Sequence, residues 1–148
     1  MINIDDLKNS YKRINKYLVE TPIVSCNALN EEFKANVYLK NEVEQLTGSF
    51  KIRGALSALS NLKNQGNKGV VAYSSGNHAQ GVSKAAQIFD MHAIIVMPED
   101  APSNKINKTK ANGAEVVLYK RQIESREDIA LQIAHEKNYP LVKPFDNE

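Results

Sequence analysis

A lysine lies in this sequence at a place where its charge is disfavoured. In the stretch TGSFKIRGALSAL (residues 47–59), the tripeptide Thr-Gly-Ser predicts a turn that ends in a helix cap at Ser49. Lys51 then falls in the first helical turn, whose positive end disfavours a cation, and Arg53 adds a second positive charge. These conditions favour the neutral amine, which is the nucleophile in Schiff-base chemistry. The alternative is a surface lysine with a solvated ammonium group. The apolar stripe of the same helix comprises Ile52, Ala55, Leu56, Leu59 and Leu62.

A second polar stretch, YSSGNHAQG (residues 73–81), lies where a predicted strand ends and a predicted helix begins. Ser74, Ser75, Gly76 and Asn77 offer hydroxyls, backbone N–H groups and a helix dipole to an anion. Open α/β sheets bind ligands at the carboxyl ends of their strands, so the position suits a binding loop. The stretch matches neither a dinucleotide fingerprint nor a Walker loop. Helix capping by Ser75 or Asn77 is the alternative interpretation.

The elements that position these two stretches follow from the apolar pattern. Short apolar runs alternate with helical patterns, which predicts right-handed βαβ units and an α/β fold, a three-layer αβα parallel sheet. The chain stops directly after a strand, and we interpret its C-terminus as truncated. The predicted strands are residues 36–42, 69–75, 92–98, 115–119 and 140–144, with an extended segment at 22–25. The predicted helices are residues 5–17, 49–64, 77–89, 105–111 and 125–138.

The composition narrows the class of function. A net charge of +2 with interspersed signs gives no case for nucleic-acid binding. No apolar run reaches the ~20 residues of a membrane span. The single cysteine, Cys26, predicts a small core residue in a reducing cytoplasm. No metal site is predicted, because neither His92 nor His135 has a Cys or carboxylate at metal-ligand spacing, and the lysines of 105–110 predict a solvated helix face.

Together, the two polar stretches resemble the fold-type II pyridoxal-phosphate enzymes, in the branch of threonine/serine dehydratases and serine racemases. The family's Ser-Phe-Lys sequence, whose lysine forms a Schiff base with the cofactor, matches residues 49–51. Its Ser-Ser-Gly-Asn-His-Ala-Gln loop matches residues 74–80. MPEDAPSNKINKTKANGAEVV (97–117) also follows the branch, and LVKPFD (141–146) departs from its Val-His-Pro-Phe-Asp at Lys143. The likeness covers essentially the whole chain.

The resemblance implies roles for particular residues. Lys51 would carry pyridoxal 5′-phosphate covalently and would later act as a base. Phe50 would lie against the cofactor ring, and Asn77 would hydrogen-bond its phenolic oxygen. The substrate carboxylate would be bound by Ser74, Ser75, Asn77 and His78.

The implied reaction is the conversion of threonine or serine to a 2-keto acid and ammonia by a PLP-dependent lyase. A serine or aspartate-type racemase is the nearest alternative, with Ser75 as the acid on the opposite face of the substrate. A non-catalytic ligand-binding module is the alternative from a different class.

The resemblance also implies a division into domains. Residues 1–65 would belong to a larger cofactor domain, and residues 66–148 would form a small α/β domain. The cofactor's phosphate site would lie beyond this chain, and the full-length enzyme would be a homo-oligomer. Without the rest of the larger domain, we expect the helical stripe at Leu56, Leu59 and Leu62 to be exposed or to drive self-association.

Overall fold

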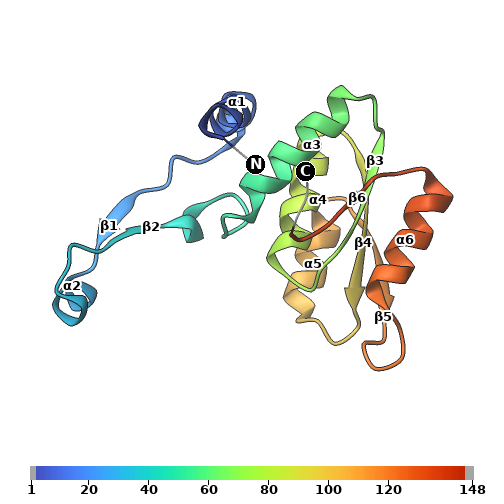
Figure 1. Ribbon diagram of the computed structural model, residues 1–148. Coiled ribbons are helices and arrows are strands. Elements are labelled where there is room, and N and C mark those ends of the chain that lie inside the picture. The colour runs from blue at the N-terminus through green and yellow to red at the C-terminus, as the bar shows by residue number, and fades with distance from the viewer. Residues whose placement is uncertain (1–2, 146–148) are drawn as a thin grey trace.

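A four-stranded parallel sheet forms the centre of the molecule (Figure 1). In the computed structural model, which describes residues 3–145, the strands lie in the order β5-β4-β3-β6, and every neighbouring pair is parallel. The predicted parallel α/β sheet is therefore confirmed. The strands are β3 (Gly69–Tyr73), β4 (His92–Pro98), β5 (Glu115–Tyr119) and β6 (Leu141–Val142).

Helices cover both faces of this sheet (Figure 1). One face carries α3 (Lys51–Asn64), α4 (Asn77–Phe89) and α5 (Ser103–Ala111), and the opposite face carries α6 (Arg126–Lys137). The predicted three-layer arrangement is confirmed, and these four helices lie close to their predicted bounds.

The two faces of the sheet have separate apolar cores. Successive residues of a strand point to opposite faces, so the apolar run of β3 divides between them. Val70 and Ala72 belong to the core beneath α3 and α4, whereas Val71 and Tyr73 belong to the core beneath α6. A strand buried on both faces explains why the sequence shows a continuous apolar run there and not an alternating one.

The stripe of α3 is covered by α4. Ile52, Leu56 and Leu59 are fully buried in the core that α4 shares. The expected exposure of Leu56 and Leu59 is therefore wrong, because residues of this chain supply the cover. The close approach depends on Gly81 of α4, where an added Cβ would lie 3.2 Å from the carbonyl carbon of Lys51.

The N-terminal helix packs beside α3. α1 (Ile4–Ile14) continues into a short 3-10 helix (Asn15–Tyr17), and together they match the predicted first helix. The hydroxyl groups of Ser10 and Ser57 lie 2.6 Å apart, which joins α1 to α3. Ile14 is buried in the same core as the stripe of α3. No helix within residues 3–145 is long and apolar enough to cross a membrane.

Between α1 and α3, residues 23–40 form an arm that projects from the body (Figure 1). It consists of β1 (Ile23–Ser25), α2 (Asn27–Phe33) and β2 (Tyr38–Lys40), and the two strands pair antiparallel. No sequence pattern predicted α2, a short helix without a side-chain cap. Cys26 precedes α2 and is only half-buried there, so the prediction of a core cysteine is wrong.

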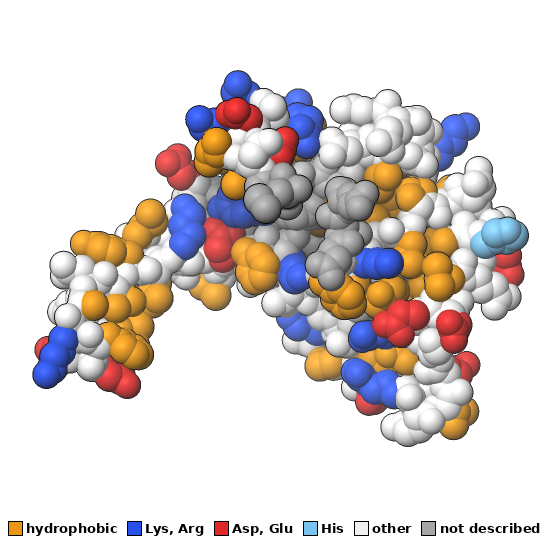
Figure 2. Space-filling view, viewed as in Figure 1, with side chains coloured by type: hydrophobic (Ala, Val, Ile, Leu, Met, Phe, Trp, Pro, Cys, Tyr) orange, Lys and Arg blue, Asp and Glu red, His pale blue; other side chains and the backbone are white. Residues whose placement is uncertain are grey.

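Hydrophobic side chains gather over the surface of the arm (Figure 2). A two-stranded hairpin is marginally stable by itself, and apolar groups that it leaves in water are typical of a surface that another segment covers. The large apolar residues exposed on the arm are Ile23, Val24, Phe33, Tyr38 and Leu39.

Candidate active site

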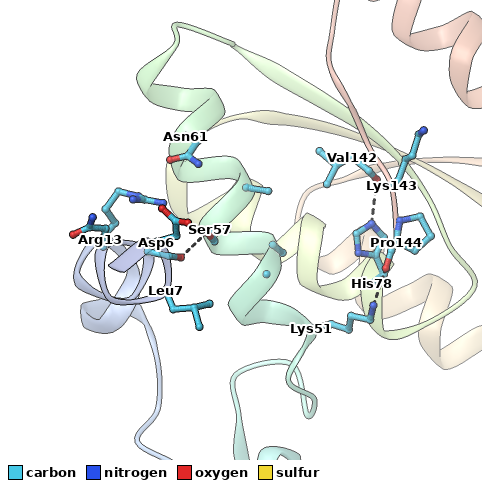
Figure 3. A pocket seen from close by; sticks show the side chains of 15 residues that line it. Asp6, Leu7, Arg13, Lys51, Ser57, Asn61, His78, Val142, Lys143 and Pro144 are labelled. Carbon is cyan, nitrogen blue, oxygen red and sulfur yellow. Dashed lines mark hydrogen bonds between the residues drawn. The ribbon is translucent and has the colours of Figure 1, made fainter. Parts of the chain in front are cut away.

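Lys51 is the first residue of α3 and is half-buried. Its Nζ donates a hydrogen bond of 2.8 Å to the backbone carbonyl of Pro144, which follows β6 (Figure 3). The Nζ also lies 5.6 Å from the ring centroid of Phe50, whose side chain is 60% exposed. The lysine thus reaches across the end of the sheet and does not extend into water as a surface lysine would.

The start of α3 differs from the prediction in one respect. Phe50 precedes the helix, and no side chain caps the helix, so the predicted cap at Ser49 is wrong. Instead, the Ser49 hydroxyl is buried without a hydrogen-bond partner among the described residues. Arg53 also differs, because Glu42 balances its charge with an ion pair of 2.7 Å.

A groove of about 840 Å³ runs between α1, α3 and the segment after β6. Figure 3 shows Lys51 and His78 pointing toward the Val142–Pro144 segment on one side of it, with α1 side chains on the other. In their neutral forms, an amine can act as a nucleophile and an imidazole can transfer protons. The polar residues that line it include Asp6, Ser10, Arg13, Lys51, Ser57, Asn61 and His78.

His78 is buried at the second position of α4. Its Nε2 lies 3.1 Å from the backbone carbonyl of Val142. A carbonyl only accepts, so Nε2 carries the proton, and in the neutral ring Nδ1 is left as an acceptor. Burial lowers the pKa of His78, and the positive charge of Lys51 acts in the same direction, while the bond to Val142 opposes them.

The lowered pKa of His78 predicts a pH-dependent stability. A group whose pKa falls on folding contributes stability that is fully present above its unfolded-state value, about 6.5, and is lost as the pH falls through the folded-state pKa. We expect the free energy of unfolding to decrease from about pH 7 to about pH 5, and His78→Gln to remove this component. Denaturant titrations at both pH values measure it, with the exposed His135→Gln as control. An identical pH dependence in wild type and His78→Gln would contradict the prediction.

The polar loop after β3 occupies the carboxyl end of that strand. The Ser74 amide donates to the Val96 carbonyl at 3.1 Å, and the Gly76 amide donates to the Ser74 hydroxyl at 3.2 Å. Gly76 precedes α4, and no side chain caps this helix, so neither Ser75 nor Asn77 has the capping role that was the alternative. Ser74 and Ser75 are half-buried and Asn77 is exposed.

The structure brings together only some of the predicted site residues. Lys51 and His78 share the groove, whereas Ser74, Ser75 and Asn77 are not among the residues that line it. The loop is nevertheless adjacent, since His78 follows it directly and Gly81, one turn later, touches the backbone of Lys51.

Lys105 is a neighbour of this loop that sequence reasoning did not single out. Its Nζ donates to the Asn77 Oδ1 at 3.1 Å, and its side chain is half-buried, while Lys108 and Lys110 are exposed as predicted. An ammonium group only donates, so the amide oxygen of Asn77 faces α5 and its NH₂ group is left to donate elsewhere. The lysine-rich pattern of the helix gave no signal that distinguished Lys105.

Three buried polar atoms around Lys51 test whether the site fits a polar cofactor. The hydroxyls of Thr47 and Ser49 precede the lysine, and the Gln80 side-chain amide lies beside Gly81; none of these atoms has a partner within residues 3–145. Such groups usually find a partner, because leaving one unpaired costs about 1–3 kcal/mol. The unpaired hydroxyls at positions 47 and 49 therefore fit a polar ligand bound near the start of α3. The described residues hold no cluster of three or more metal-ligating side chains.

A parallel αβα sheet with helices on both faces, and a groove beside it that Lys51 lines, defines the class as an α/β protein. The family model described as pyridoxal-phosphate dependent enzyme matches residues 14–148, and the chain belongs to this family.

Individual relatives have several activities. The chain is 41% identical over 143 residues to L-threo-3-hydroxyaspartate ammonia-lyase of Saccharomyces cerevisiae, covering 96% of this chain and 44% of the relative. It is 41% identical to L-threonine ammonia-lyase of Thermotoga maritima, covering 99% of this chain and 37% of the relative. The crystal structure of serine racemase from Dictyostelium discoideum matches with a TM-score of 0.89 and 40% identity, over 99% of this chain and 48% of that one. The chain thus spans less than half the length of these relatives.

Proposed function

We propose that this chain supplies the Schiff-base lysine and the substrate-carboxylate loop of a pyridoxal-phosphate-dependent lyase that acts on threonine or serine. The observation that carries the proposal is the setting of Lys51, a half-buried residue at a helix start that the unpaired buried hydroxyls of Thr47 and Ser49 precede in the chain. Membership of the family and similarity to two ammonia-lyases support the reaction class.

Pyridoxal phosphate, when bound, would supply an electron sink for the charge that develops at the substrate Cα. Lys51 would bond to its aldehyde, with Phe50 beside the ring and the NH₂ group of Asn77 directed at the phenolic oxygen. The substrate amine would replace Nζ on the aldehyde, and the freed Nζ of Lys51 would then take the Cα proton. The β-hydroxyl would leave as water with that proton, and addition of one water would release the 2-keto acid and ammonia.

The loop of residues 74–78 would hold the substrate carboxylate. Its hydroxyls and backbone N–H groups lie at the start of α4, where the helix dipole favours negative charge. A carboxylate bound there would lie near Lys51, because Gly81 of the same helix lies close to the lysine's backbone.

Racemisation is the second candidate, favoured by the similarity to serine racemase. It would use Lys51 on one face and Ser75 as the proton donor on the other. Incubating the natural protein that carries this chain with PLP and L-threonine or L-serine separates the candidates. A lyase releases 2-keto acid and ammonia, a racemase releases the D-amino acid, and a binding module gives neither product.

Ser75→Ala is expected to weaken substrate binding in that protein. The hydroxyl would donate to a carboxylate, and the loss of such a charge-assisted bond costs about 1.5–3 kcal/mol. The KM for threonine should therefore rise roughly ten- to a hundredfold. Ser103→Ala, an exposed change at the start of α5, is the matched control. A normal KM in Ser75→Ala would contradict the proposed role of the loop in binding the substrate carboxylate.

We also propose a domain division, an oligomeric state and a location for the enzyme. Residues 1–65 would belong to a larger domain and residues 66–148 to a small one, in a homo-oligomeric cytoplasmic enzyme. The exposed apolar surface of the arm supports a larger domain that covers it. The packing of α3 against α4 would then be the contact that joins the two domains.

A further inference from the structure

Arg53 and Glu42 form a two-pronged ion pair beside the lysine. The Nη2 and Nε of Arg53 lie 2.7 Å and 2.8 Å from the two carboxylate oxygens of Glu42. The two side chains are 30% and 16% exposed, so water reaches the pair only in part. A planar guanidinium that bonds both oxygens fixes an orientation as well as a distance.

Further bonds tie Glu42 to the segment before the arm. The buried Thr21 hydroxyl donates to Glu42 at 2.6 Å, and the Lys40 ammonium donates to the Thr21 carbonyl at 2.6 Å. The hydrogen bond from Arg53 is the main cause that lowers the pKa of Glu42 to about 2, with Thr21 acting in the same direction and burial opposing. The carboxylate therefore keeps its charge throughout the physiological pH range.

The segment from Glu42 to Lys51 is anchored along its length. The side chain of buried Gln45 bonds both backbone groups of Val19, at 3.0 Å and 2.9 Å. The Gly48 amide donates to the Gln45 carbonyl at 2.6 Å, and Gly48 has a φ of 69°, which favours glycine. Thr47 and Ser49 lie on either side of Gly48, and α3 then begins at Lys51 without a side-chain cap.

Because α3 has no side-chain cap, its first turn is held by other contacts. Gly81 sets how closely the helix approaches α4, and the Arg53–Glu42 pair ties the same turn to the preceding segment. Lys51 lies between these two contacts. A reactive amine needs a narrow range of positions, since a misplacement of about 1 Å can cost 10²-fold in rate.

We propose that Glu42 and Arg53 are a positioning pair, which sets the Lys51 amine for capture of the cofactor aldehyde. The inference rests on the proposed function and deepens it. The pair acts through geometry: it fixes the segment that carries the unpaired hydroxyls of Thr47 and Ser49 relative to the first turn of α3.

The test measures how fast pyridoxal phosphate reacts at Lys51 in the natural protein that carries this chain. Borohydride quenching at early times, followed by peptide mass mapping, gives the labelling rate at Lys51 and at the exposed Lys108. We expect Glu42→Gln, which keeps the shape but removes the charge, to slow labelling at Lys51 by roughly ten- to a hundredfold. The rate at Lys108 should stay unchanged.

Two further variants separate positioning from charge and from folding. Arg53→Lys keeps the charge but loses the fork, so labelling at Lys51 should stay slow. Asp100→Asn breaks the exposed pair with Arg121, whose Nε–Oδ1 distance is 2.8 Å, and should change nothing. Circular dichroism identifies any variant that fails to fold, and Arg53→Lys then replaces Glu42→Gln as the test.

The outcomes distinguish the inference from the function on which it rests. Unchanged labelling at Lys51 in folded Glu42→Gln, or an equal change at Lys51 and Lys108, overturns the positioning pair. Wild-type protein that shows no preference for Lys51 over Lys108 overturns the proposed role of Lys51 itself.

Discussion

Lys51→Ala is expected to abolish keto-acid production by the natural protein that carries this chain. The amine would both bond the cofactor and move the Cα proton, and the loss of a general base alone costs about 10²–10⁴-fold. The fold should survive, because Lys51 is half-buried and not a core residue, so a change of about 1 kcal/mol in unfolding free energy is expected.

The matched control for this variant lies on the same helix. Lys63→Ala removes another lysine of α3 that donates to a backbone carbonyl, that of Asp90 at 3.2 Å, and it should retain full activity. Residual activity of Lys51→Ala within tenfold of wild type would rule out the lysine as nucleophile and base.

Leu59→Ala is expected to produce the largest loss of stability. Leu59 is 0% exposed and packs in the core that α3 and α4 share. Truncation of a buried leucine costs about 2–5 kcal/mol, from the lost transfer free energy and the cavity that remains. Denaturant unfolding of the 148-residue chain measures this change directly.

Leu131→Ala is the control for the core variant, since this leucine of α6 is 54% exposed. It should change the free energy of unfolding by about 0.5 kcal/mol or less. An equally small effect of Leu59→Ala would mean that the stripe of α3 is open to water, as the sequence analysis expected, and would contradict the packing of α3 on α4.

Local patterns in the sequence were sufficient to predict the sheet and its helices. Apolar runs such as GVVAY and the helical spacing that follows report burial directly, so β3 and α4 appear close to their predicted places. The pattern of α3 likewise identified an apolar stripe. It could not identify the covering helix, because that depends on Gly81, thirty residues along the chain from Lys51.

The contacts of the site could not be predicted in the same way. The bonds from Lys51 to Pro144 and from His78 to Val142 join residues that are 93 and 64 positions apart. Arg53 was interpreted from its neighbours alone, as an added positive charge, whereas its partner Glu42 lies on a separate segment. Tertiary pairing decides the effective charge around the lysine, and a local pattern carries no information about it.

The family resemblance predicted which residues form the site, and the structure brings only some of them together. Lys51 and His78 meet in one groove, while the roles of Ser74, Ser75 and Asn77 in carboxylate binding stay predictions. Lys105 orients the Asn77 amide. The lysine pattern predicts a solvated face for the whole helix, and this holds for the exposed Lys108 and Lys110 but does not reveal the contact of Lys105.

The most direct test of the central claim is the site of covalent attachment. The natural protein that carries this chain is loaded with pyridoxal phosphate, reduced with borohydride, digested and mapped by mass spectrometry. The pyridoxyl group is expected on the peptide that contains Lys51, in stoichiometric yield. Stoichiometric label on another lysine, with Lys51 unmodified, would contradict the assignment of Lys51 as the Schiff-base residue.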